Sequence, residues 1–214
     1  MRAVVMCGGL GTRLRPLTDT TPKALLPVAG RPVLDRLLEK LAEAGITDVT
    51  LAIGYLGEQI ERRYGSKLRV AHLPDEWVVN IDYIRQEKPM GTAGALSLLA
   101  DKSQPVLVVN GDKVFELASD IQRVAEAPGL SAVGTIPYEV PCGVVLDGRD
   151  GFEFHEKPVL QACAGIYRLV AGLVQRVPAG YFDIPAQLDC PHSVELKGYV
   201  LDIGTPESYQ AACA

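Results

Sequence analysis

Residues 3–18 read AVVMCGGLGTRLRPLT, and this stretch decides the fold. Its first part, Ala3–Cys7, is a short apolar run that predicts a buried β-strand, and the glycines that follow predict a loop. Three glycines in this loop let the backbone come close to a ligand and turn its N–H groups toward phosphate oxygens. Arg13 adds a planar group of donors that suits phosphate geometry. The stretch therefore predicts a phosphate-bearing ligand at the end of the first strand.

Charge around the loop supports a polyanionic small ligand. Between Thr12 and Arg31 the basic residues are Arg13, Arg15, Lys23 and Arg31, and the one acidic residue is Asp19, although the whole chain has a net charge of -5. The loop is no Walker A motif, because the Gly-Lys-Ser/Thr ending is missing. It is also a poor dinucleotide fingerprint, because Leu14 occupies the third glycine position, which disfavours an NAD-dependent dehydrogenase.

The order of elements predicts an α/β fold. Short apolar runs such as Val49–Ile53 and Val106–Val109 alternate with helical patterns such as Val33–Ala44, which is typical of βαβ units around a mainly parallel sheet. Gly91–Ala100 predicts a small-residue helix, and Ser119–Ala127 a helix with Ser119 as its N-cap. Further strands are expected after residue 130, with a hairpin among them, so the sheet should be mixed. We expect one domain over residues 1–214, with a nucleotide-binding half to about residue 115 and a more mixed half over about residues 116–214.

Composition limits the function classes. The chain is 48% hydrophobic and 22% charged, as in ordinary globular proteins. Its acidic balance argues against broad nucleic-acid binding, and no apolar run is long enough to span a membrane or to form a signal peptide. Five scattered cysteines, without a C-x-x-C pair, suggest reduced thiols and therefore a cytoplasmic protein with neither disulfides nor a zinc site.

The sequence resembles the sugar-1-phosphate nucleotidylyltransferases, which include mannose- and heptose-1-phosphate guanylyltransferases and glucose-1-phosphate thymidylyl- and uridylyltransferases. The resemblance runs from Met1 to about Ala212 in ordered blocks. These blocks are Gly8–Thr18, Pro22–Pro32, Gln86–Leu96, Asn110–Asp112, Glu156–Pro158, Ala164–Tyr167 and Asp202–Glu207. It implies a Rossmann-like three-layer fold of the nucleotide-diphospho-sugar transferase type. It also implies joining of a nucleotidyl group from a nucleoside triphosphate to a sugar 1-phosphate, with release of pyrophosphate.

Roles can be carried over block by block as what the resemblance implies. The catalytic residues are expected to be Arg13, Lys23 and Lys157. The nucleotide is expected to contact Gly8, Gly9, Gly11, Thr12, Gln86 and Gly91. The sugar phosphate is expected to contact Gly143, Glu156, Lys157, Ala164 and Gly165. Within these sets, Arg13 and Lys23 would stabilise the triphosphate and pyrophosphate, whereas Lys157 would hold the attacking phosphate.

A magnesium ion held by Asp112 and Asp202 is expected to bridge the phosphates, since Mg²⁺ prefers carboxylate, water and phosphate oxygens. Both aspartates follow apolar strands, where carboxylates project into a ligand crevice. Lys113 departs from the family pattern. It could pair with Asp112, contact a phosphate or weaken metal binding.

The nucleobase and the assembly are less constrained. Residues 87–96 resemble the guanylyltransferase branch most, so GTP with a mannose- or heptose-type 1-phosphate ranks first, and UTP or dTTP with a hexose 1-phosphate second. A catalytically silent regulatory subunit would be expected to lack Arg13, Lys23, Asp112, Lys157 or Asp202, and all five are present. No β-helix extension follows Ala214, so a monomer or homodimer is expected.

Overall fold

The computed structural model describes residues 1–70, 77–148, 151–184 and 191–214. Within these ranges the helices are α1 (Val33–Glu43), α2 (Gly57–Tyr64), α3 (Gly91–Gly94), α4 (Ala118–Glu126), α5 (Ala171–Gln175) and α6 (Pro206–Cys213). Short 3₁₀ helices lie at Thr12–Leu14, Leu17–Asp19, Lys23–Leu25 and Ala95–Leu98. No helix of the described ranges is long and apolar enough to cross a membrane.

The main sheet has the strand order β13-β9-β12-β7-β1-β4-β6-β5 among the described residues. Its strands are β1 (Arg2–Met6), β4 (Asp48–Ile53), β5 (Lys67–Val70), β6 (Trp77–Arg85), β7 (Val106–Asn110), β9 (Ser131–Glu139), β12 (Val159–Leu169) and β13 (His192–Glu195). β1 runs parallel to β4 and β7, and β4 runs parallel to β6. β12 is antiparallel to both β7 and β9. The predicted mixed, mainly parallel sheet is confirmed.

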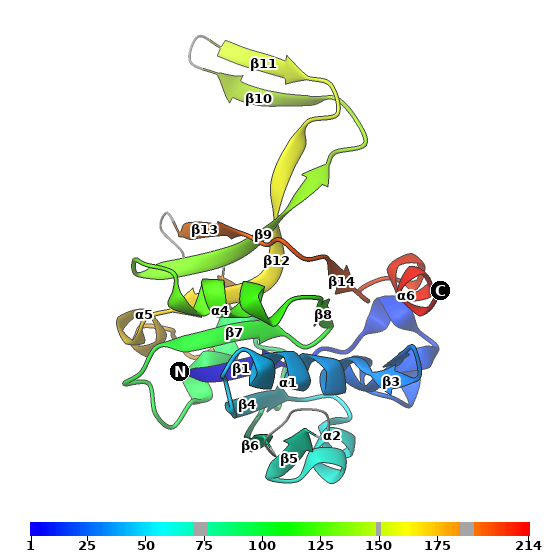
Figure 1. Cartoon of the computed structure of the whole chain (residues 1–214), viewed down its shortest axis with the longest axis vertical. Helices are drawn as coiled ribbons and strands as arrows, with labels where there is room; N and C mark the ends of the chain where they lie inside the picture. The colour runs from blue at the N-terminus through cyan, green and yellow to red at the C-terminus, as the bar shows by residue number, and fades with distance from the viewer. Residues whose placement is uncertain (71–76, 149–150, 185–190) are drawn as a thin grey trace.

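Apolar side chains alternate between the two faces of the sheet, and helices cover both. Val5 and Leu107 lie in a core with Leu38 of α1 and Ile121 of α4. On the opposite face, other residues of the same strands pack against α5 and the Gly91–Leu98 segment. Strand neighbours point to opposite sides, so one apolar run supplies two cores. The result is the Rossmann-like three-layer arrangement that the sequence predicts (Figure 1).

Three small two-stranded sheets complete the fold: β2 (Pro27–Val28) with β3 (Arg31–Pro32), β8 (Lys113–Phe115) with β14 (Val200–Asp202), and β10 (Val144–Gly148) with β11 (Gly151–His155). The β10–β11 hairpin stands away from the body of the molecule, at the end of the extended ribbon formed by β9 and β12 (Figure 1). The β8–β14 pair lies beside α6 and joins segments 89 residues apart, since Lys113 is the register partner of Asp202.

Two local expectations were wrong. α4 begins at Ala118 after an extended Leu117, so Ser119 lies inside the helix and does not cap it. The segment predicted as one helix over Gly91–Ala100 is a single helical turn followed by a 3₁₀ turn that ends at Leu98. Phe182 explains part of this difference, because its carbonyl accepts from the backbone N–H groups of Ala93 and Gly94, which therefore serve a tertiary contact.

Candidate active site

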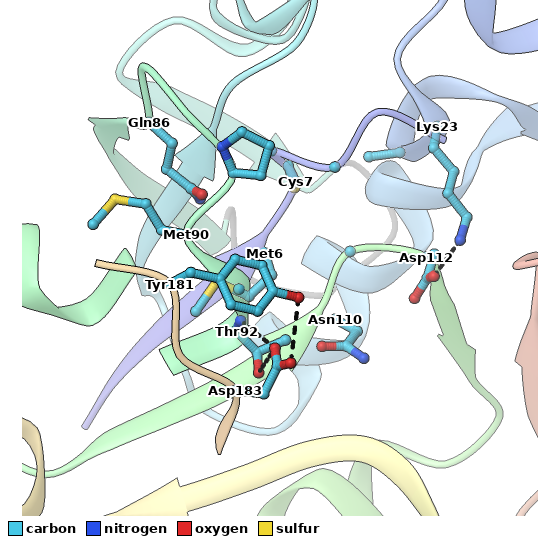
Figure 2. A pocket seen from close by; sticks show the side chains of 16 residues that line it. Met6, Cys7, Lys23, Gln86, Met90, Thr92, Asn110, Asp112, Tyr181 and Asp183 are labelled. Carbon is cyan, nitrogen blue, oxygen red and sulfur yellow. Dashed lines mark hydrogen bonds and ion pairs between the residues drawn. The ribbon is translucent and has the colours of Figure 1, made fainter. Parts of the chain in front are cut away.

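A cavity of about 320 Å³ opens where β1 and β7 end. Parallel strands β1, β4 and β7 present their carboxyl ends at this edge, which is where ligands bind in open α/β sheets. The cavity is lined by Met6, Cys7, Gly8, Gly9, Lys23, Ala24, Gln86, Pro89, Met90, Gly91, Thr92, Asn110, Gly111, Asp112, Tyr181 and Asp183. Figure 2 shows Gln86 and Met90 on one side and Lys23 and Asp112 on the other.

Two glycines of the loop, Gly8 and Gly11, have little room for a side chain, whereas a Cβ at Gly9 would meet nothing within 4 Å. A Cβ at Gly8 would lie 2.9 Å from the side-chain amide of Gln86, and one at Gly11 would lie 2.8 Å from the methyl group of Thr18. Gly11 has a left-handed φ of 62°, which favours glycine. The buried Thr18 hydroxyl donates to the Gly11 carbonyl at 2.8 Å. These contacts hold the loop in one shape with its backbone facing the cavity.

Lys23 and Asp112 form an ion pair at the side of the cavity away from Gln86 and Met90 (Figure 2). Lys23 comes from the 3₁₀ turn after Pro22, and Asp112 from the turn after β7. Their side chains are 17% and 23% exposed, so the pair is partly shielded from water and its charges interact more strongly than at an open surface. The Lys23 ammonium is thereby positioned where a phosphate could approach the glycine loop.

The chemistry of Asp112 suits a divalent cation. Its Oδ2 accepts from Lys23, while its Oδ1 is buried and has no hydrogen-bond partner among the described residues. A buried carboxylate oxygen without a donor is a natural magnesium ligand, because Mg²⁺ binds one or two carboxylates together with substrate phosphates. No group of three or more His, Cys, Asp or Glu residues gathers within the described ranges. The fit therefore rests on Asp112, with Asp202 beside it.

Lys113 pairs with Asp202, not with Asp112. Its Nζ lies 2.7 Å from Asp202 Oδ2, and Asp202 Oδ1 accepts from the Gly204 backbone N–H at 2.6 Å. Partial burial raises the pKa of Asp202, but the hydrogen bond and the charge of Lys113 outweigh it and hold that pKa below its usual range. The antiparallel register of β8 and β14 creates this pair, because Asp202 stands directly opposite Lys113.

The remaining predicted loop residues, Thr12 and Arg13, lie outside the cavity. Both residues are exposed. One terminal nitrogen of Arg13 would lie 3.5 Å from a Cβ built at Gly204, so the guanidinium is close to the chain just beyond Asp202. Lys23 and Asp112 thus line the cavity, whereas Arg13 does not.

The predicted acceptor residues fall into two groups. Gly143 and Glu156 are neighbours, because a Cβ at Gly143 would lie 3.4 Å from a Glu156 carboxylate oxygen. Glu156 and Lys157 connect β11 to β12, in the projecting hairpin, and the structure does not bring them to the cavity (Figure 1). Lys157 also has a left-handed φ of 43°.

The second group lies on β12. Ala164 is buried in the core, with 1% of its surface exposed, and it does not line the cavity. Gly165 has a φ of 76°, and the pairing register of β12 with β9 shifts between Cys163 and Tyr167. Such a bulge redirects the chain, and here it brings Gly165 against Asn110 at the end of β7 and Lys113 of β8.

The structure adds cavity residues that the sequence analysis left without a role. Asp183 Oδ1 accepts from the Thr92 backbone N–H at 3.2 Å, and the Thr92 hydroxyl donates to it at 3.4 Å. Tyr181, 66% exposed, stands at the cavity with its hydroxyl toward Asp183 (Figure 2). Their segment shows neither period 2 nor period 3.6, so no local pattern identifies it. Burial raises the pKa of the Cys7 thiol, and the charge of Asp112 adds a smaller contribution. Cys7 is therefore an unreactive thiol in the cavity lining.

Comparisons with known proteins agree with this geometry. A family model described as nucleotidyl transferase matches residues 2–182. A mannose-1-phosphate guanyltransferase of Schizosaccharomyces pombe is 34% identical over 234 residues, and one of Candida albicans is 32% identical over 232 residues. Each alignment covers 98% of this chain and 62% of the relative. The chain therefore spans less than two thirds of the length of these relatives.

Solved structures share the fold. A Bacillus anthracis protein provisionally assigned as a glucose-1-phosphate thymidylyltransferase, in complex with a sucrose, has a TM-score of 0.78 at 26% identity and covers 99% of this chain and 93% of its own. HddC from Yersinia pseudotuberculosis, complexed with GMP-PN, has a TM-score of 0.69 at 23% identity and covers 99% of this chain and 97% of its own. The second likeness concerns the fold alone.

Proposed function

Because the chain belongs to the nucleotidyl transferase family, we propose that it transfers a nucleotidyl group from a nucleoside triphosphate to a sugar 1-phosphate. An oxygen of the sugar phosphate attacks the α-phosphorus, a new P–O bond forms, the bond to the bridging oxygen of the β-phosphate breaks, and pyrophosphate leaves. The observation that carries the proposal is the Lys23–Asp112 pair beside the glycine loop, at the end of the cavity opposite Gln86 and Met90.

The reaction brings two anions together, so positioning and charge neutralisation supply most of the catalysis. In this proposal, the backbone of Gly8, Gly9 and Gly11 faces the triphosphate, and Lys23 neutralises charge on it. Arg13 and Thr12 hold the departing pyrophosphate from outside the cavity. Gln86 and Gly91 face the base, which enters the side away from Lys23. Asp112 and Asp202 hold magnesium, and the bound ion would spread the phosphate charge that develops during transfer.

Gly143, Glu156, Lys157, Ala164 and Gly165 remain the proposed acceptor-binding residues. For Glu156 and Lys157 the proposal requires that the β10–β11 hairpin comes nearer to the cavity, because it stands away from the body of the molecule (Figure 1). Gly165 needs no such movement, because it is already next to Asn110.

GTP with a mannose- or heptose-type 1-phosphate is the substrate pair that we propose first. The names of the relatives from S. pombe and C. albicans support it at 34% and 32% identity. A uridylyl- or thymidylyltransferase is the second candidate, supported by the name of the B. anthracis protein at 26% identity. A catalytically silent subunit is disfavoured, because Lys23 and Asp112 are present and already paired.

The same proposal includes the setting of the protein. We place it in the cytoplasm, where nucleoside triphosphates are available and where thiols such as Cys142, Cys163 and Cys213, all exposed and free, remain reduced. We propose a single domain, since β9 and β12 of the second half join the same sheet as β1 and β4. A monomer or homodimer completes the proposal.

Pyrophosphate release with Mg²⁺ tests the function, with GTP, UTP, dTTP, CTP and ATP each paired with a panel of sugar 1-phosphates. Release that requires both substrates is the expected result, with GTP and mannose 1-phosphate fastest. Lys23→Met should abolish most of the release, whereas the matched variant Lys67→Met, at an exposed position of edge strand β5, should retain it. Absence of release from the whole panel, with nucleotide binding intact, would contradict the proposal and favour the silent subunit.

A further inference from the structure

We propose that Lys113 and Asn110, with Gly165 as their floor, form the subsite that holds the phosphate and a hydroxyl of the acceptor sugar. The inference deepens the proposed function and rests on it. It assigns the acceptor phosphate to a lysine in the body of the molecule, in addition to Lys157 on the projecting hairpin. Neither Lys113 nor Asn110 has a ligand role in the function proposed above.

Lys113 is an unusually shielded cation. Its side chain is 12% exposed, and among the described residues its ammonium hydrogen-bonds to one group, the Asp202 carboxylate at 2.7 Å. Lysines are almost never buried without a partner, and an ammonium has three N–H donors. Asp202 orients the ammonium and leaves two donors for a ligand. An incoming phosphate could therefore bind Lys113 while Asp202 still holds it.

Asn110 contributes an acceptor that lacks a donor. Its Oδ1 is buried and has no hydrogen-bond partner among the described residues, although Asn110 lines the cavity. Buried polar atoms are rarely left unpaired, so such an atom at a cavity wall indicates a ligand that donates to it. Figure 2 shows the Asn110 amide on the same side of the cavity as Asp112, away from Gln86.

Gly165 brings the two side chains together. A Cβ at this position would lie 2.8 Å from Lys113 Cε and 3.0 Å from Asn110 Nδ2, so both side chains rest against the same Cα atom. The left-handed φ of 76° and the bulge in β12 create this close approach. The ammonium-bearing side chain of Lys113 and the side-chain amide of Asn110 thus flank one glycine, although they come from β8 and β7.

The chemistry of this pair selects a phosphorylated polyol. The ammonium needs an anion, and the amide oxygen needs a hydroxyl donor; a sugar phosphate offers both. The ribose and α-phosphate of a nucleotide offer the same groups. The acceptor is the better match, because Gly165 belongs to β12, on the far side of β7 from the glycine loop that follows β1. The experiment therefore measures nucleotide and acceptor separately.

Binding to the full chain, measured by calorimetry without Mg²⁺, tests the inference with mannose 1-phosphate, inorganic phosphate and GTP as probes. Lys113→Met keeps the hydrocarbon stem against Gly165 and removes the charge. We expect its affinity for mannose 1-phosphate and for inorganic phosphate to fall roughly tenfold or more, because a charge-assisted hydrogen bond is lost, while GTP affinity stays within about twofold. Lys113→Arg should retain most of the mannose 1-phosphate affinity, because it keeps the charge.

Asn110→Ala separates the hydroxyl contact from the phosphate contact. It should weaken mannose 1-phosphate and leave inorganic phosphate unchanged, and it covers the case in which Lys113→Met does not fold. Unchanged mannose 1-phosphate affinity in both variants would overturn the inference, as would an equal loss of GTP affinity, which would place Lys113 on the nucleotide. Failure of the wild-type chain to bind any sugar 1-phosphate of the panel used for pyrophosphate release would also overturn the inference. Because these readouts need no turnover, inactivity in pyrophosphate release leaves them valid and refutes only the proposed reaction.

Discussion

Asp120 should be among the most costly polar side chains to remove, because it fastens α4 to the chain that leads into β14. Its side chain is 3% exposed and pairs with Arg123 at 2.7 Å. Its carboxylate also accepts from the backbone N–H of Lys197 at 3.0 Å and of Gly198 at 2.8 Å. Asp202 lies only four residues beyond Gly198, so this carboxylate helps to position one of the proposed metal ligands.

Asp120→Ala leaves two backbone donors without an acceptor and removes one partner of a largely buried ion pair. Unpaired buried groups cost about 1 to 3 kcal/mol each, and a broken buried pair costs about 3 to 5, so we expect a loss of ~3 to 5 kcal/mol in the free energy of unfolding. For a chain of this size that loss lowers Tm by roughly 6 to 20 °C. Urea and thermal unfolding followed by circular dichroism measure both quantities.

Arg123→Ala is the matched control, because it keeps the Asp120 carboxylate on both amides. Arg123 is 36% exposed, so we expect this variant to cost about 1 to 2 kcal/mol. The reasoning fails if Asp120→Ala unfolds within about 1 kcal/mol of the wild type. It also fails if Arg123→Ala is as costly as Asp120→Ala, since the contacts of Arg123 with Asp120 and with the Glu195 carbonyl, and not the backbone amides, would then carry the effect.

Three further predictions concern the cavity walls and the ion pairs. Gly111→Ala should lower the free energy of unfolding in urea by about 1 to 3 kcal/mol, because its Cβ would lie 2.8 Å from the Met6 carbonyl oxygen. Gly172→Ala is the control and should show no such loss, because its Cβ would meet nothing within 4 Å. Equal losses in the two variants would refute the steric argument. Iodoacetamide should modify Cys142, Cys163 and Cys213 in the native protein, but it should modify Cys7 only after denaturation, because burial raises the pKa of the Cys7 thiol. Mass spectrometry of the peptides identifies the modified cysteines, and labelling of Cys7 in the native protein would contradict its burial. In the folded protein the pKa of Asp202 is below its usual range, so its stabilising contribution should be present above the unfolded pKa of about 4 and disappear as pH falls through the folded value. The difference in urea midpoint between the wild type and Asp202→Asn should therefore shrink in acid. A difference that does not depend on pH would exclude the ion pair as its source.

Local patterns predict most of the fold. Apolar runs such as Val106–Val109 lie in central strands, because a strand that is buried on both faces can be apolar throughout. The helix α1 begins at Val33, as its periodic leucines predict. The resemblance also selects residues that line one cavity, since Gly8, Lys23 and Asp112 meet there. Their meeting follows from topology, because the ends of β1 and β7 lie side by side in a parallel pair.

Contacts between distant segments cannot be predicted from local sequence patterns. Lys113 could have paired with its neighbour Asp112, but the register of β8 against β14 places Asp202 opposite it. Asp183 reaches the cavity through Thr92, which is 91 residues away. The direction of the hairpin that precedes Lys157 is equally non-local, because it depends on how β9 and β12 continue beyond the sheet edge (Figure 1). Periodicity carries information about one element at a time, so none of these pairings is encoded in it.

A small apolar cluster explains why the charged residues of the site gather where they do. Leu14, Val114 and Ile203 are almost fully buried and belong to this one cluster, together with Leu26, Val28 and Val33. Each of the first three is the chain neighbour of a charged site residue: Arg13, Lys113 or Asp202. Burying one residue of an extended segment turns its neighbour the other way. Packing of this cluster therefore directs the Lys113 ammonium and the Asp202 carboxylate away from it on the same side of the β8–β14 pair, and the ion pair forms above these apolar contacts.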